Sequence, residues 1–177
     1  QSPQAASERL LTQEVDIADY VACERAVARI VRELGGIHIL INNAALGPGV
    51  VRSDTYDKPI DILEITPALW QRVVAVNFSG AWNMTRATIQ PLRAQRWGRI
   101  IEVTTSFFTM LRGGVQPYGA TKAGLEAMAC AHAQEFEGSG VTVNVVVPGG
   151  PADTPMVPPD APIKRADLIP PSVMAPP

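Results

Sequence analysis

The chain has 177 residues, of which 46% are hydrophobic and 18% charged, and its formal net charge is −2. That composition can bury a core, so intrinsic disorder is excluded, and the length corresponds to one domain. The charge is nearly balanced and contains no basic run, which excludes nucleic acid or an anionic membrane as the main partner. No apolar stretch approaches the roughly 20 residues of a membrane helix, so no membrane span is expected.

The two cysteines, Cys23 and Cys130, lie far apart in the sequence and form neither a CxxC pair nor a metal-ligand spacing. Both fall in helical patterns, where a small buried thiol in a reducing compartment is the common situation. The first twenty residues contain no apolar signal segment. We therefore expect a cytoplasmic protein without a bound metal.

The first regular element is predicted over residues 20–34. Its apolar side chains recur at helical spacing, with charged residues on the other face, and Gly35 follows as a helix terminator. Residues 37–41 are almost continuously apolar and β-branched, which is typical of a strand buried on both faces of a parallel sheet. Residues 44–65 have the composition of a loop.

The middle of the chain predicts a long helix over residues 68–96. Thr66 can act as its N-cap, and Pro67 suits the first helical position. We expect this helix to be disturbed near residues 79–80, where a glycine follows a serine, and near Pro91.

Two further strands are predicted over residues 99–104 and 141–147, separated by a helix over residues 117–137. Helices and strands therefore alternate, which predicts an α/β fold with a parallel sheet and right-handed crossovers. Most of the 16 prolines lie in residues 148–177. That segment cannot be regular throughout, and it forms either a substrate-side loop or a loosely held tail.

Small or polar residues follow each predicted strand, at the carboxyl end where parallel sheets bind their ligands. They are Asn42-Asn43-Ala44-Ala45, Thr104-Thr105-Ser106 and Pro148-Gly149-Gly150. Tyr118 and Lys122, four residues apart, share one face of the helix that follows the second of these strands. A nearby cation lowers the pKa of a phenol, which could then exchange a proton with an alcohol or carbonyl oxygen near neutral pH. Taken alone, this spacing is weak evidence, because it occurs by chance on many helices and is more often a surface pair.

Several motifs occur in a set order along the chain. They are Asn-Asn-Ala after a strand, Val-Asn-Phe-Ser-Gly around Asn77, hydroxyls at a strand end, Tyr-x-x-x-Lys, and Val-Asn-x-x-x-Pro-Gly. Together they resemble the short-chain dehydrogenase/reductase family, in its classical branch, over about Val15 to Met156. The resemblance implies a Rossmann-like, doubly wound parallel sheet, here truncated at both ends. It also implies hydride transfer between NAD or NADP and an alcohol or ketone, by a homodimer or homotetramer packed through the helices that hold Asn77 and Tyr118.

The same resemblance implies roles for individual residues. Tyr118 would be the general acid/base, Lys122 would bind the nicotinamide ribose and lower the tyrosine pKa, and Asn77 would hold a water in a relay to Lys122. The implied cofactor contacts, besides Tyr118 and Lys122, are Asp16, Ile17, Asn42, Ala44, Ala45, Pro148, Gly149 and Thr154.

The chain departs from the family pattern at its catalytic hydroxyl and in two turns. The family serine stands thirteen residues before the tyrosine, where this chain has Thr105, although a one-residue bulge could present Ser106 instead. Ala45 replaces a glycine, which alters the turn if its backbone needs a positive φ. The segment from Pro148 to Thr154 is one residue longer than the pattern.

The largest departure is that no glycine-rich, pyrophosphate-binding turn precedes Asp16. We therefore interpret residues 1–150 as a partial dinucleotide-binding domain and residues 151–177 as a Pro-rich substrate-side loop or tail of the same domain, both within an internal fragment. A parallel sheet without its first strands should expose apolar edges and faces. We expect such a chain to be poorly stable alone and to bind dinucleotide weakly.

Three other functions fit parts of the sequence. A non-catalytic relative or scaffold would keep the fold but would not need Tyr118, Lys122 and Asn77 together. A sugar-nucleotide epimerase or dehydratase would share the Tyr-Gly-x-x-Lys motif. A serine hydrolase could use Ser106 and His132, but the Gly-x-Ser-x-Gly turn is absent from the sequence.

Substrate selection is expected to lie in residues 45–57, in residues 107–116 and in the tail from Gly150 onward. If Phe107, Phe108, Met110 and Leu111 face the pocket, its wall is apolar and favours an aliphatic, cyclic or steroid-like alcohol or ketone. The same side chains could instead belong to the core or to an interface.

Overall fold

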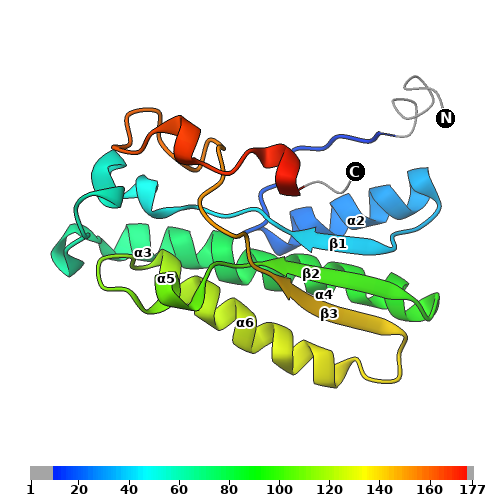
Figure 1. Cartoon of the computed structure of the whole chain (residues 1–177). Helices are drawn as coiled ribbons and strands as arrows, with labels where there is room; N and C mark the ends of the chain where they lie inside the picture. Colours follow the sequence, from blue (N-terminus) through cyan, green and yellow to red (C-terminus); the bar gives the residue numbers. More distant parts are fainter. Residues whose placement is uncertain (1–9, 175–177) are drawn as a thin grey trace.

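The computed structural model describes residues 10–174, which fold around a three-stranded parallel sheet of order β1-β2-β3. The strands are β1 (Ile39–Asn42), β2 (Gly98–Val103) and β3 (Val141–Val146). Parallel neighbours need long crossovers, and here the crossovers are helices (Figure 1). The predicted α/β fold with a parallel sheet is confirmed, with strand bounds shifted by one or two residues.

Helix α2 spans Tyr20–Leu34, the predicted range. Its N-cap is Asp19, whose carboxylate accepts hydrogen bonds from the backbone N–H groups of Val21 and Ala22 at 2.9 and 3.2 Å. Gly35 ends the helix with φ at 83°, a conformation that glycine adopts without strain. Both ends of α2 are therefore determined by local sequence.

The long predicted helix is divided into three parts: α3 (Pro67–Val74), a single π-helical turn η4 (Ala75–Ser79) and α4 (Gly80–Ala94). The expected disturbance next to Gly80 is this π turn. At Gly80 a side-chain Cβ would lie 2.7 Å from Cγ1 of Ile17, so the absence of a side chain lets the two segments approach closely. Pro91, in contrast, is accommodated inside α4 and does not end it.

The remaining helices and turns lie between β1 and α3, between β2 and β3, and after β3. The residues predicted as loop contain three 3-10 turns, and the segment after β2 contains a short helix that the sequence did not predict. These elements are η1 (Pro48–Val50), η2 (Ser53–Tyr56), η3 (Ile62–Glu64), α5 (Phe107–Leu111), α6 (Tyr118–Glu135), η5 (Arg165–Asp167) and η6 (Pro171–Met174). None of the described helices is long and apolar enough to cross a membrane.

Helices pack on one face of the sheet, and the core lies between that face and α4 and α6. Its buried side chains are Ile37, Leu40, Ile89, Leu92, Ile100, Phe136 and Val141. On the other face Ile39 and Ile41 are 51% and 58% exposed. The prediction that β1 is buried on both faces is therefore wrong, because β1 has helices on one side only. The predicted exposed apolar face is confirmed.

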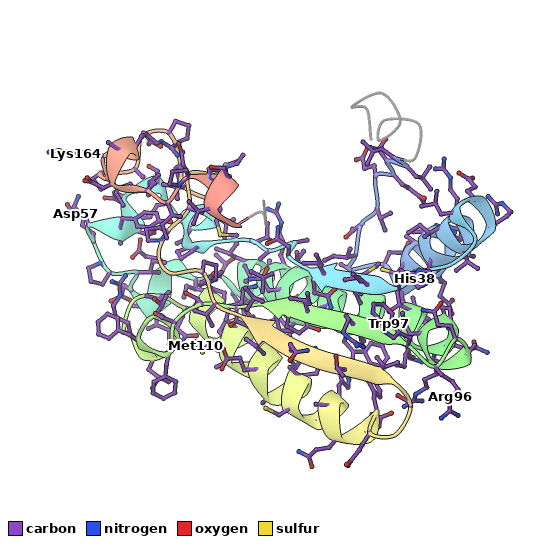
Figure 2. The ribbon with its side chains drawn as sticks, turned by 45° about the vertical axis from the view of Figure 1, so that its right-hand side comes forward. His38, Asp57, Arg96, Trp97, Met110 and Lys164 are labelled. Atoms are coloured by element: carbon purple, nitrogen blue, oxygen red, sulfur yellow. The ribbon has the colours of Figure 1, made fainter. Side chains whose placement is uncertain are left out.

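The C-terminal segment is folded back onto the strand ends, beside the chain that holds η1 and η2 (Figure 1). Ala152 forms an isolated parallel bridge with Ile169, and Val157 and Leu168 are buried. The described part of this segment is therefore docked on the fold by apolar side chains. Figure 2 shows it at the end of the sheet that also carries Met110, whereas His38 and Trp97 mark the opposite end.

Candidate active site

Two adjoining cavities open at the carboxyl ends of the strands. The first, of about 330 Å³, is lined by Thr105, and we name it the Thr105 cavity. The second, of about 480 Å³, is lined by Lys122, and we name it the Lys122 cavity. Six residues line both, so the two spaces meet: Thr104, Tyr118, Pro148, Ala152, Thr154 and Met156.

Tyr118 is the first residue of α6 and stands between the two cavities. Gly119 lets α6 approach α5 closely, because a Cβ there would lie 2.7 Å from the carbonyl oxygen of Met110. Burial raises the pKa of the Tyr118 phenol, and a hydrogen bond from the Thr105 hydroxyl opposes this shift. The prediction of a lowered pKa is thus wrong for the chain without ligands, because desolvation dominates.

Lys122 lies one helical turn further along α6 and is 3% exposed. Its Nζ donates a hydrogen bond of 2.7 Å to the carbonyl oxygen of Val103 and lies 5.8 Å from the centre of the Tyr118 ring. Burial lowers the pKa of Lys122 to about 8, although the Glu102 carboxylate favours the charged form. The two side chains therefore share one face, as their spacing predicted.

A buried polar cluster behind the strand ends was not predicted from the sequence. Glu102 on β2 is 0% exposed, and its Oε1 accepts a hydrogen bond of 2.9 Å from Nδ2 of Asn42. The same Nδ2 lies 3.2 Å from Oγ1 of Thr85 on α4. Burial raises the pKa of Glu102 to about 7, while Asn42 and the charge of Lys122 act in the opposite direction. Asn42 thus turns toward the helices, and its neighbour Asn43 lines the Lys122 cavity.

Asn77 lies in the π turn and is 1% exposed. Its Oδ1 accepts a 2.7 Å hydrogen bond from the backbone N–H of Leu46, and its Nδ2 donates one of 2.9 Å to the carbonyl of the same residue. Nδ2 also lies 3.2 Å from Oγ1 of Thr121 on α6. Asn77 therefore ties the loop after β1 to the helix that carries Tyr118 and Lys122, and it lines neither cavity. A π turn often marks a functional position in a helix.

The two candidate hydroxyls have different surroundings. Ser106 is the N-cap of α5, where its Oγ accepts a hydrogen bond from the backbone N–H of Thr109 and lies 2.9 Å from that residue's hydroxyl. Thr105, one residue earlier, is the hydroxyl that acts to lower the pKa of Tyr118. Both side chains line the Thr105 cavity.

The other predicted cofactor contacts fall into two groups. Ala44, Ala45, Pro148, Gly149 and Thr154 line one or both cavities. Asp16 and Ile17 do not, because they precede α2, where the Ile17 carbonyl accepts a hydrogen bond of 2.8 Å from Asn83. Ala45 needs no special conformation, since Arg96 is the one non-glycine residue with a positive φ in the part of the chain that the structure describes.

The apolar residues expected in the substrate pocket lie elsewhere. Phe107, Phe108 and Leu111 are 73%, 74% and 66% exposed, and Met110 is buried. None of the four lines the Thr105 cavity. Thr55 and Tyr56 of η2 do line it, within residues 45–57 where substrate selection was expected. The turn that presents them was not predicted, because a short 3-10 turn gives no periodic signal.

The hydrolase alternative finds no support in this geometry. His132 stacks on Phe136 with 5.2 Å between ring centres. It lies fourteen residues beyond Tyr118 along α6, or about 20 Å at 1.5 Å per residue. It is therefore on the part of the helix remote from Ser106.

Comparisons with known proteins identify relatives of the chain. The family model described as short chain dehydrogenase matches residues 1–162. Acetoacetyl-CoA reductase of Paracoccus denitrificans is 33% identical over 138 residues, which are 78% of this chain and 53% of that protein. The chain spans about half the length of the curated relatives that it matches.

Solved structures share the fold. A Burkholderia xenovorans protein described as a short-chain dehydrogenase/reductase superposes with a TM-score of 0.73 at 27% identity, covering 87% of this chain and 57% of its own. A metagenomic short-chain oxidoreductase, solved in complex with NADP, superposes with a TM-score of 0.68 at 24% identity, covering 79% of this chain and 59% of its own.

Proposed function

The chain belongs to the short-chain dehydrogenase/reductase family, and from that premise we propose that it carries the proton-transfer site of an NAD- or NADP-dependent oxidoreductase. The substrate is an alcohol or the corresponding ketone. The observation that carries this proposal is the position of Tyr118, which lies between two adjoining cavities with Thr105 on one side and Lys122 on the other.

The Lys122 cavity suits the nicotinamide and ribose of the cofactor. It lies at the carboxyl ends of parallel strands, where such folds bind dinucleotides. The Lys122 ammonium uses one N–H on the Val103 carbonyl and keeps two for ribose hydroxyls. Ala44, Ala45, Pro148 and Thr154 form the walls. When bound, the nicotinamide supplies hydride to the substrate carbon or accepts hydride from it.

Tyr118 supplies the proton in the reductive direction. Its raised pKa keeps the phenol protonated near neutral pH, so it can donate to a carbonyl oxygen as that oxygen gains negative charge. A hydroxyl holds the same oxygen by a hydrogen bond. We assign this role to Thr105, because the hydroxyl of its neighbour Ser106 caps α5. Lys122 stabilises the phenolate that remains. Asn77 fixes the loop after β1 relative to α6 through its hydrogen bonds to Leu46 and Thr121.

The proposal extends to the rest of the chain. Residues 1–150 form part of a dinucleotide-binding domain, and residues 151–177 cover the substrate side of the same domain. Trp82 on α4 is 45% exposed. Self-association through α4 and α6 would cover such apolar surface, and sedimentation velocity measures it directly.

Replacing Tyr118 by Phe tests the proposal in the protein as its source makes it. Turnover of a panel of aliphatic and cyclic ketones should fall at least about a hundredfold, because the proton donor is lost. NADH or NADPH affinity, measured by fluorescence titration, should stay within about twofold, since most dinucleotide contacts remain. Tyr20→Phe, on the exposed side of α2, is the matched control and should retain activity. A wild-type protein without turnover would favour the scaffold alternative.

A further inference from the structure

The Thr105 cavity has one charged side chain in its lining, Arg112, and no carboxylate. Arg112 follows α5 as its C-cap residue. Within residues 10–174, seven ion pairs form and Arg112 takes part in none of them. The nearby Arg165 is different, since it is bound to Asp153 at 2.7 Å and to the Val157 carbonyl at 2.9 Å. The wall of this cavity thus offers one guanidinium without an acidic partner.

Residues of η2 also line this cavity. Thr55 is 5% exposed, and its Oγ1 has no hydrogen-bond partner. That oxygen has no accessible surface, so it faces protein atoms and a ligand in the cavity does not reach it. Thr55 belongs to η2, and its neighbour Tyr56 also lines the cavity with a half-buried phenol.

The fold brings these residues together from two separate segments. The backbone N–H of Ile60, just after η2, donates a hydrogen bond of 3.2 Å to the carbonyl of Gly114, just after α5. Gly114 also packs against Pro59 so closely that a Cβ would lie 2.4 Å from the proline Cβ. Arg112 and Tyr56 therefore line the same cavity as Tyr118 and Thr105. Figure 1 shows η2, in cyan, and α5 at the same end of the molecule.

We propose that this wall binds the carboxylate of the substrate, so that the ketone substrate is an oxo acid and the alcohol is a hydroxy acid. The Arg112 guanidinium pairs with the carboxylate, and the phenol of Tyr56 donates a hydrogen bond to it. The carbonyl carbon then lies toward Tyr118 and Thr105. A volume of about 330 Å³ suits a small molecule that reaches both groups. This inference rests on the proposed oxidoreductase function.

Steady-state kinetics on the protein as its source makes it can test the inference. The substrates are acetoacetate, levulinate and their methyl esters, which differ in charge and in the distance from the ketone to the carboxyl group. In Arg112→Gln the acid-to-ester ratio of kcat/KM should fall about tenfold for the acid of matching length. Arg86→Gln, on the outer side of α4, should leave that ratio unchanged. An equal loss for acid and ester in Arg112→Gln, or no loss for either, would overturn the inference.

A binding measurement, which needs no turnover, separates the carboxylate site from the oxidoreductase function. Calorimetric titration with levulinate should show about tenfold weaker binding in Arg112→Gln and about threefold weaker binding in Tyr56→Phe. Thr55→Val removes a hydroxyl that the cavity does not reach, so it should leave levulinate binding unchanged and the thermal midpoint unchanged or higher. A wild type that reduces the neutral esters but shows no preference for acids refutes the carboxylate site alone. Levulinate binding without any ketone reduction refutes the oxidoreductase function and leaves the carboxylate site standing.

Discussion

The two faces of the sheet differ in what they hold. The helix-covered face contains the apolar core together with Asn42 and Glu102, and it supports the helix that carries Lys122. The open face presents Ile39 and Ile41, both more than half exposed. Every group that we assign to proton transfer is anchored from the covered face or the strand ends. The geometry of the candidate site therefore depends on one face of the sheet, whereas the other face leaves Ile39 and Ile41 exposed.

The largest effect on stability is expected from a cavity made in the core on the covered face. Ile100→Ala should lower the free energy of unfolding by about 2–5 kcal/mol, because Ile100 is fully buried between the sheet and the helices. Ile41→Ala, its counterpart on the open face, should cost less than about 1 kcal/mol in the 177-residue chain. Urea unfolding of both variants checks the comparison. Equal losses would show that the open face is covered.

The next effect concerns Glu102 and appears as a pH dependence. Its pKa rises from 4.5 to about 7 in the folded chain, so the folded state binds the proton more tightly than the unfolded state. The stability that Glu102 contributes is therefore fully present below pH 4.5 and is lost as the pH rises to about 7. Glu102→Gln removes this titration. As the pH rises from 4.5 to about 7, the unfolding free energy of Glu102→Gln should increase by about 3 kcal/mol relative to that of the wild type. A difference between the two proteins that stays constant with pH would contradict the assignment.

A smaller effect is expected where α5 meets α6. Gly119→Ala should cost about 1–3 kcal/mol, because its Cβ would lie 2.7 Å from a backbone oxygen that cannot move freely. Gly124→Ala is the matched control in the same helix, since its Cβ would meet the edge of the Phe78 ring at 3.3 Å and that ring can shift. Thermal unfolding ranks the two variants. If Gly124→Ala were the more damaging, the close contact of α5 and α6 would be in doubt.

The regular elements could be predicted where the signals are local. Asp19 and Gly35 determine both ends of α2, and the alternation of elements predicts the parallel sheet. Helix α5 was missed because its five residues are too few for a helical period, and its start depends on the Ser106 cap. The open face of β1 could not be predicted, because an apolar run does not reveal which of its faces is covered.

The candidate site also contains residues that the sequence predicted and residues that it could not predict. The helical spacing placed Tyr118 and Lys122 on one face. Glu102 was missed because a carboxylate in a strand suggests exposure, and its burial depends on Asn42 and Thr85, which are distant in sequence. The direction of the Tyr118 pKa was wrong for a related reason, since desolvation is set by the surrounding fold and not by the neighbour four residues away.

Deuterium transfer tests the central claim most directly. The protein as its source makes it is incubated with a ketone and with NADH or NADPH deuterated at the reactive nicotinamide carbon, and the alcohol is analysed by mass spectrometry. We predict one deuterium on the carbinol carbon with wild type and a yield at least about a hundredfold lower with Tyr118→Phe. Undiminished transfer in Tyr118→Phe, or none in a wild type that binds the cofactor, would contradict the role of Tyr118 as the proton donor of an oxidoreductase.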